Sequence, residues 1–166
     1  MNRRHFLSRT LLAVAGVTSL RQSMLADAQA PAKPGARIDK VVKTEDEWRK
    51  LLTPAQFDVL RREGTEAPFS SPLNNEKRKG TFACVACDLP LFDSRTKYDS
   101  GTGWPSFYDF LPGSLGTKTD FKIIYPRTEY HCIRCGGHQG HVFDDGPKPT
   151  GKRYCNNGVA LKFIAA

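Results

Sequence analysis

The spacing of apolar residues changes along the chain, from a helical period before position 65 to short strand-like runs after position 80. Two short helices are expected in the first part. Thr44 with Glu47 three residues later forms a capping box at the start of the first helix. Thr53 followed by Pro54 marks the start of the second, which is expected to stop at Gly64.

After position 80 the pattern predicts strands. The segment 119–125 mixes polar and apolar positions and contains isoleucines and aromatic residues. A turn then leads into a second strand over 128–133, and a closing strand is expected over 159–164. Fourteen Gly and eleven Pro indicate many turns. We therefore predict a mainly β fold of two antiparallel sheets, a sandwich or partly open barrel, with the two short N-terminal helices outside it.

The first part of the chain has the pattern of an export signal. Arg3 and Arg4 precede an apolar run over 11–17, and small residues at alternate positions follow it. This order resembles a twin-arginine signal peptide, and the preferred cleavage position is after Ala28. The apolar run is too short to span a bilayer stably, so no stable membrane insertion is expected. The alternative is an uncleaved amphipathic anchor.

The chain is accordingly divided into a signal peptide over 1–28, a linker over 29–40 and a single domain over 41–166. A twin-arginine signal implies export to a bacterial periplasm. Residues 1–28 carry four Arg against one Asp, +3 of the net +8, which leaves +5 for the remainder. The mature part has no continuous basic stripe with interleaved aromatic residues, so nucleic-acid binding is not expected.

Four of the five cysteines form two Cys-x-x-Cys pairs separated by a long segment. The pairs are Cys84 with Cys87 and Cys132 with Cys135. Four thiolates fill the tetrahedral coordination of zinc, so the spacing predicts one structural Zn²⁺ per chain. The alternatives are two disulfides or a redox-active pair, which an oxidising compartment would permit.

The fifth cysteine, Cys155, has no partner in this pattern and is a candidate nucleophile. In an extended segment, Arg153, Cys155 and Asn157 would share a face. A cation beside a thiol lowers its pKa and favours the thiolate. The alternative is a buried, inert thiol, which is a common fate of free cysteine.

Two further motifs carry candidate site residues. His138 and His141 lie three apart around a glycine and could both face one site, where imidazoles could donate protons. They could instead be metal ligands or ordinary surface histidines. A Gly- and Pro-rich turn over 100–107 presents Trp104, as an apolar wall of a pocket or as a core residue.

Together these motifs resemble the B-type peptide-methionine (R)-S-oxide reductases. The matching segments are Ser-Gly-x-Gly-Trp-Pro-Ser-Phe at 100–107, Gly-His-Val-Phe-Asp-Asp-Gly-Pro at 140–147 and Thr-Gly-x-Arg-Tyr-Cys-x-Asn at 150–157, with both Cys-x-x-Cys pairs. The match runs from about Glu47 to Phe163. The resemblance implies two antiparallel sheets, a structural zinc remote from the catalytic cysteine, and reduction of the R epimer of methionine sulfoxide.

The resemblance also implies roles for individual residues. Cys155 would be the nucleophile that is left as a sulfenic acid, and Trp104 would receive the methyl group of the substrate. His138, His141 and Asn157 would hold and protonate the sulfoxide oxygen. Phe143 and Arg153 are expected in the substrate site.

The chain departs from many members of this family at Thr102, where those members carry a resolving cysteine. We therefore expect no internal disulfide during turnover, and regeneration by an external, thioredoxin-like dithiol. The expected substrate is oxidised methionine in proteins, with the free amino acid as a second candidate, and the protein is expected to be a monomer. The alternative function is a non-catalytic zinc-knuckle module that binds a peptide.

Overall fold

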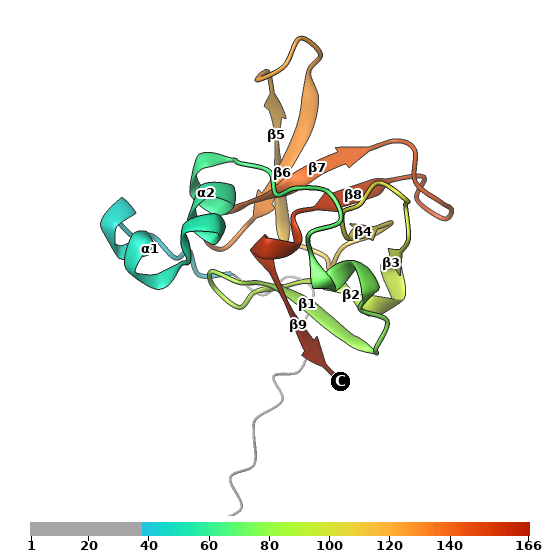
Figure 1. Ribbon diagram of the computed structural model, residues 1–166, viewed down its shortest axis with the longest axis horizontal. Coiled ribbons are helices and arrows are strands. Elements are labelled where there is room, and N and C mark those ends of the chain that lie inside the picture. Colours follow the sequence, from blue (N-terminus) through green and yellow to red (C-terminus); the bar gives the residue numbers. More distant parts are fainter. Residues whose placement is uncertain (1–37) are drawn as a thin grey trace, which may run out of the picture. The chain divides into compact units, whose positions relative to one another are not determined.

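The computed structural model of the protein describes residues 38–166. The expected signal peptide over 1–28 lies outside the described residues, as does most of the linker over 29–40. The described part contains two short helices and two antiparallel sheets (Figure 1), which confirms the predicted mainly β fold.

Both helices begin where their capping signals predict. Helix α1 spans Glu45–Leu51 and α2 spans Pro54–Arg62, and each has a complete capping box at its N-terminal threonine. Helix α2 was expected to stop at Gly64 and ends at Arg62, because the next residue, Glu63, takes the left-handed conformation (φ 57°). Within residues 38–166, no helix has the length and apolar character needed to cross a membrane.

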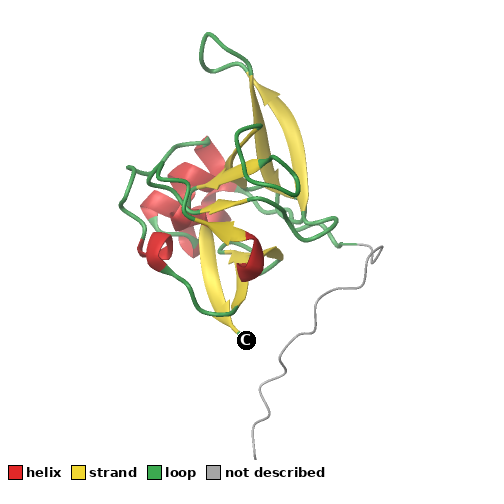
Figure 2. Ribbon diagram, turned by 90° about the vertical axis from the view of Figure 1, so that its right-hand side faces the viewer, coloured by secondary structure: helices red, strands yellow, loops and turns green. Residues whose placement is uncertain are grey.

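The nine strands within residues 38–166 form two sheets in which every pairing is antiparallel, and Figure 2 shows them from a second direction. The three-stranded sheet has the order β2-β1-β9, with β1 Gly80–Cys84, β2 Pro90–Asp93 and β9 Leu161–Ala165. The six-stranded sheet has the order β3-β4-β8-β7-β6-β5. Its strands are β3 Lys97–Tyr98, β4 Ser106–Phe107, β5 Leu115–Asp120, β6 Arg127–Cys132, β7 His138–Phe143 and β8 Arg153–Asn156.

The predicted strand over 119–125 is wrong in its position. The strand is β5 and it ends at Asp120, and the residues that follow form an exposed turn between β5 and β6. Apolar residues favour a strand when one face is buried, but Ile124 is 93% exposed and Phe121 is 77% exposed. The closing strand begins at Leu161, later than predicted, because a short 3₁₀ turn precedes it.

Aromatic side chains join the two sheets. Phe92 of β2 stacks on Phe107 of β4, with ring centroids 4.2 Å apart and planes 10° apart. Phe82 of β1 meets the edge of the same Phe107 ring at 5.0 Å. All three side chains are fully buried. Since β4 pairs directly with β8, this stack supports the strand that carries Cys155.

Replacing Phe92 by alanine should lower the free energy of unfolding by about 3–5 kcal/mol, because the change leaves a cavity in the inter-sheet core. Phe121→Ala is the matched control, since that ring is 77% exposed, and it should change the free energy of unfolding by less than about 0.5 kcal/mol. Chemical denaturation of both variants measures the difference. Similar losses in the two variants would contradict the assignment of Phe92 to the core.

Candidate active site and metal centre

The pairing of β7 with β8 sets the geometry of the candidate active site. His141 lies directly opposite Cys155 and Phe143 lies opposite Arg153 in this antiparallel register. Side chains of directly opposed residues lie on the same face of a sheet. The Arg153 guanidinium accordingly lies 4.4 Å from the centre of the Phe143 ring. The register therefore gathers four of the predicted site residues on one face.

A bulge in β7 brings the second histidine to that face. In a regular strand, His138 and His141 would point to opposite faces, because side chains alternate. The pairing with β6 shifts register here, with Tyr130 opposite Gly140 and His131 opposite His138. The extra residue that this shift leaves in β7 turns the side chain of His138 to the same face as that of His141. The rings of His138 and His141 lie with centroids 5.4 Å apart.

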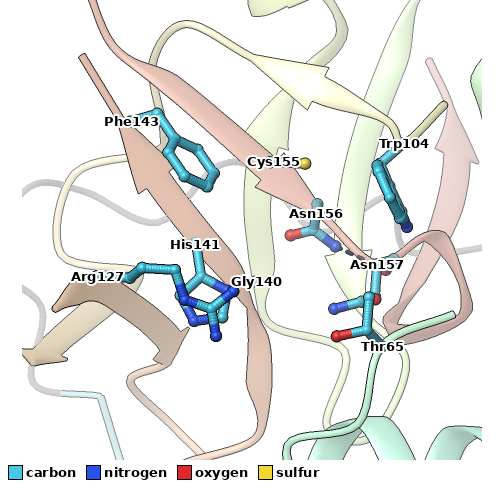
Figure 3. A pocket seen from close by; sticks show the side chains of 9 residues that line it. All are labelled: Thr65, Trp104, Arg127, Gly140, His141, Phe143, Cys155, Asn156 and Asn157. Carbon is cyan, nitrogen blue, oxygen red and sulfur yellow. Dashed lines mark hydrogen bonds between the residues drawn. The ribbon is translucent and has the colours of Figure 1, made fainter. Parts of the chain in front are cut away.

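A pocket of about 130 Å³ opens on this face (Figure 3). Five predicted site residues contribute to its lining, namely Trp104, His141, Phe143, Cys155 and Asn157. Figure 3 shows the Cys155 sulfur between the rings of Phe143 and Trp104, with Arg127 and His141 on the polar side. The arrangement combines aromatic walls, a half-buried sulfur and nitrogen-bearing side chains.

Trp104 is held in place by the segment that follows α2. Its indole Nε1 donates to the carbonyl oxygen of Glu66 at 3.1 Å. The Glu66 carboxylate accepts hydrogen bonds from the backbone N–H groups of Gly158 and Val159. The backbone N–H of Glu66 donates to Asn157 Oδ1 at 3.0 Å. Glu66 therefore connects the aromatic wall to the end of β8.

The amide of Asn157 is engaged on both sides. While its Oδ1 accepts from Glu66, its Nδ2 donates to the carbonyl oxygen of Gln139 at 3.0 Å. The side chain is buried and joins the loop after α2 to β7. Asn157 therefore holds Glu66 and Gln139 together at the floor of the pocket.

The pKa of the Cys155 thiol is set by opposing effects. Burial raises its pKa above the ordinary value, while Arg153 and a hydrogen bond with Thr102 lower it. The effect of burial is the largest, so the pKa of the Cys155 thiol is raised, whereas the sequence predicted a lowered pKa. The positive charge of Arg153 is itself engaged, because its guanidinium makes two 2.8 Å hydrogen bonds to the Asp145 carboxylate.

His141 is oriented by an acid from the neighbouring hairpin. Its Nε2 lies 2.7 Å from Asp120 Oδ2, which also accepts from Arg127 at 2.6 Å. The backbone N–H of Lys122 is the main cause of a lowered Asp120 pKa, and the bonds from His141 and Arg127 add to it. Burial lowers the pKa of His141, against the effect of Asp120. An ionised Asp120 assigns the proton to Nε2 and leaves Nδ1 of neutral His141 as an acceptor.

His138 lies behind His141 and does not line the pocket. Its Nδ1 bonds to Glu129 Oε1 at 2.8 Å, and His131 Nδ1 bonds to Oε2 of the same carboxylate at 3.1 Å. Burial alone would raise the pKa of Glu129, but these two bonds outweigh it and lower the pKa to about 2. The Nε2 atom of His138 is buried and has no hydrogen-bond partner among the described residues.

The four remaining cysteines form a compact cluster, and all four sulfur atoms lie within 4.8 Å of one another. The Sγ distances are 3.7 Å for Cys84 to Cys135 and 3.5 Å for Cys87 to Cys132. A tetrahedral zinc with Zn–S bonds of about 2.3 Å requires sulfur–sulfur edges of about 3.8 Å, which these distances approach. The cluster therefore fits a metal ion. Among the described residues, no histidine belongs to it.

The local turns and the two sheets explain how the cluster forms. Cys84 ends β1 and Cys132 ends β6, so each pair lies at a strand end, as predicted. The turns close with backbone bonds from Asp88 to Cys84 and from Gly136 to Cys132, and both donor residues have positive φ. Because β1 and β6 belong to different sheets, a metal held here would link them.

Several residues of the site escaped the sequence reasoning. They are Thr65 and Arg127 in the pocket lining, and Glu66, Asp120 and Glu129 as hydrogen-bond partners of predicted residues. None lies within the motifs around Trp104, the histidines or Cys155, and the contacts join segments far apart in the chain. A buried acid becomes recognisable only when the strand that faces it is known.

Comparison with known proteins identifies relatives over the same region. Residues 52–165 match the SelR domain family. The chain is 54% identical over 123 residues to "Peptide methionine sulfoxide reductase B1, chloroplastic" of Arabidopsis thaliana, covering 74% of this chain and 61% of that protein. It is 55% identical over 124 residues to "Peptide methionine sulfoxide reductase MsrB" of Methanosarcina barkeri, covering 74% of this chain and 87% of that protein. The similarly named protein of Pseudomonas putida is 54% identical over 127 residues, 76% of this chain and 96% of that protein.

Replacing Cys87 by serine should remove the bound metal and destabilise the fold together, by about 4 kcal/mol or more, because a metal held by four thiolates contributes folding free energy. Metal content per chain and chemical denaturation are measured on the same sample. Cys155→Ser is the control and should keep its metal, since Cys155 is outside the cluster. Metal loss in the Cys155 variant alone would contradict this division of the cysteines.

Proposed function

This chain belongs to the SelR-domain family of B-type methionine sulfoxide reductases, and on that premise we propose that it reduces methionine (R)-S-oxide through Cys155. As a member of the family it is an oxidoreductase that acts on methionine sulfoxide. The substrates we propose are oxidised methionine residues in proteins and the free amino acid. The observation that carries the proposal is the Cys155 sulfur in a pocket with one aromatic and one polar side.

The two-sided pocket supports selection of one epimer. The sulfoxide sulfur carries a methyl group, an oxygen and the side-chain carbon in a fixed chiral order. Trp104 and Phe143 offer an apolar place for the methyl group, and Arg127 offers a hydrogen bond to the oxygen. His141 can offer a second one after its Nδ1 has accepted the thiol proton. The opposite epimer would place its oxygen against an aromatic ring without a partner, which is costly in a buried site.

The proposed reaction starts with attack of the Cys155 sulfur on the sulfoxide sulfur. In the adduct that this attack forms, the protonated oxygen passes to the Cys155 sulfur. A new S–O bond forms there while the S–O and S–S bonds of the methionine sulfur break, so methionine leaves as the thioether and Cys155 remains as a sulfenic acid. The thiol proton ends on the transferred oxygen, and the two electrons that the methionine sulfur gains come from the Cys155 sulfur, so this step needs no outside reductant. His141, held by Asp120, is the proposed group that carries the proton from the thiol to the oxygen.

The other predicted residues have supporting roles in this proposal. Arg153 and Thr102 oppose the effect of burial and so favour the Cys155 thiolate. Asn157 holds the pocket floor through its bonds to Glu66 and Gln139. His138 fixes the position of His141 from behind, through ring contact and its own bond to Glu129.

Regeneration requires a second thiol that the pocket does not contain. By the resemblance, Thr102 stands where many family members carry a resolving cysteine, and it lies close enough to Cys155 to lower the pKa of that thiol. The four other cysteines belong to the metal cluster. We therefore propose direct reduction of the sulfenic acid by an external dithiol of the thioredoxin type, which yields water, the free Cys155 thiol and an oxidised partner.

Three further features belong to the same proposal. The ion in the four-cysteine cluster is zinc, one per chain, and it is structural because the four thiolates fill its coordination. Residues 1–28 are a twin-arginine signal peptide cleaved after Ala28, and the mature protein is periplasmic. The mature protein is a monomer. The alternative function, a non-catalytic peptide-binding module, is not favoured. Its only support is the four-cysteine cluster, and it leaves the pocket around Cys155 unexplained.

An assay with dithiothreitol and the separated epimers tests the proposed activity. We expect turnover of the R epimer, and turnover of the S epimer lower by about 1,000-fold or more, because the buried oxygen loses its partners. Cys155→Ser should abolish turnover and keep metal content and fold. Equal turnover of both epimers, or activity in the serine variant, would refute the assignment of this pocket.

Thr102→Cys tests the recycling step. With one equivalent of substrate and no reductant, the natural chain should keep an oxygen on Cys155, which a sulfenic acid-specific reagent traps. In the variant, the new thiol lies beside Cys155 and should condense with the sulfenic acid to a disulfide. Mass spectrometry distinguishes these products. An internal disulfide to Cys155 in the natural chain would contradict the proposed external reduction.

A further inference from the structure

The turn between β5 and β6 concentrates exposed apolar side chains. Within residues 38–166, eight large hydrophobic side chains are exposed, and four of them lie in residues 121–125, here named the hairpin tip. They are Phe121 (77% exposed), Ile123 (49%), Ile124 (93%) and Tyr125 (76%). Scattered exposed apolar residues need no explanation, but a contiguous group marks an interaction site. Figures 1 and 2 show the hairpin tip projecting beyond the sheets.

The hairpin tip is continuous with the pocket. Asp120 precedes it and binds His141, and Arg127 follows it and lines the pocket. These two residues are joined to each other by a 2.6 Å ion pair across the base of the tip. The backbone N–H of Lys122 closes onto the same Asp120 carboxylate at 2.8 Å. A molecule that reaches the pocket past Arg127 therefore meets the hairpin tip next.

The same hairpin is braced against the end of α2. The Glu63 carboxylate accepts from Lys118 of β5 and forms a 2.7 Å ion pair with Lys122 of the tip. Two residues further on, Thr65 lines the pocket. These contacts hold the base of the hairpin beside the pocket from two directions.

We propose that the hairpin tip docks the polypeptide segment that flanks the oxidised methionine, when that segment is unfolded and apolar. This inference rests on the proposed function. A pocket of about 130 Å³ accepts the end of one side chain, so the neighbouring residues of a protein substrate must lie outside it. Continuity between pocket and tip places those neighbours against the exposed apolar side chains.

The chemistry of the substrate matches this surface. Methionine is among the most buried residue types, so its neighbours are often apolar. Oxidation makes the side chain polar and disrupts the core that contained it, which exposes those neighbours. An apolar segment can then bury surface against the hairpin tip. The free amino acid has no flanking residues, so its reduction does not use the tip.

The test compares two double variants that each remove two exposed apolar side chains without changing charge. The tip variant is Phe121→Ser with Ile124→Ser, and the matched control is Val42→Ser with Leu51→Ser, since Val42 is 90% and Leu51 61% exposed. The substrates are an oxidised peptide with apolar flanks, one with glycine and serine flanks, and N-acetyl-methionine sulfoxide.

For the apolar peptide, the tip variant should lose roughly tenfold in kcat/KM, mainly through a higher KM, which is the loss expected for one or two weak apolar contacts. Its kinetics with the other two substrates should stay at the natural level. The control variant should match the natural chain on all three substrates.

Unchanged kinetics of the tip variant with the apolar peptide would overturn the docking proposal, as would an equal loss on all three substrates. A dimer of the natural chain that becomes monomeric in the tip variant would also overturn it, by assigning the tip to a contact between two copies. Failure of the natural chain to reduce any of the three substrates would instead overturn the proposed function.

Discussion

The position of Cys155 depends on the close pairing of β7 with β8. Gly140 faces Asn156 in this pairing, and a Cβ atom at Gly140 would come within 1.9 Å of the carbonyl oxygen of Cys155. Only glycine permits this approach. It brings His141 opposite Cys155, and the bulge beside it turns His138 to the same face. The positions of the Cys155 sulfur, the two imidazoles and the Phe143 ring therefore follow from one strand register.

The surrounding structure fixes that register from several sides. The four-cysteine cluster joins the ends of β1 and β6, and β6 pairs with β7. Two buried carboxylates orient the histidine rings on these strands by hydrogen bonds. Glu129 holds two imidazoles with one side chain, and Asp120 connects His141 to the outer hairpin. Structural and chemical roles are thus separated among the five cysteines but linked through adjacent strands.

Features encoded in short segments could be predicted from the sequence, and those made by distant contacts could not. The capping box at Thr44 and the Thr53-Pro54 signal predicted the two helix starts, and the Cys-x-x-Cys spacing predicted the cluster. The strand predicted over 119–125 failed because its apolar residues serve an exposed turn instead of a buried face. Glu66 and Glu129 were missed because their partners lie far away in the chain, and the sign of the Cys155 pKa shift depends on burial.

Alkylation of the folded protein under anaerobic conditions tests the division of the cysteines most directly. Our account predicts that iodoacetamide modifies one cysteine, that peptide mapping identifies it as Cys155, and that activity is lost in proportion while the metal is retained. Substrate should slow the modification, since Cys155 lines the pocket. Modification of Cys84, Cys87, Cys132 or Cys135 with metal release and parallel loss of activity, while Cys155 stays unmodified, would contradict the account.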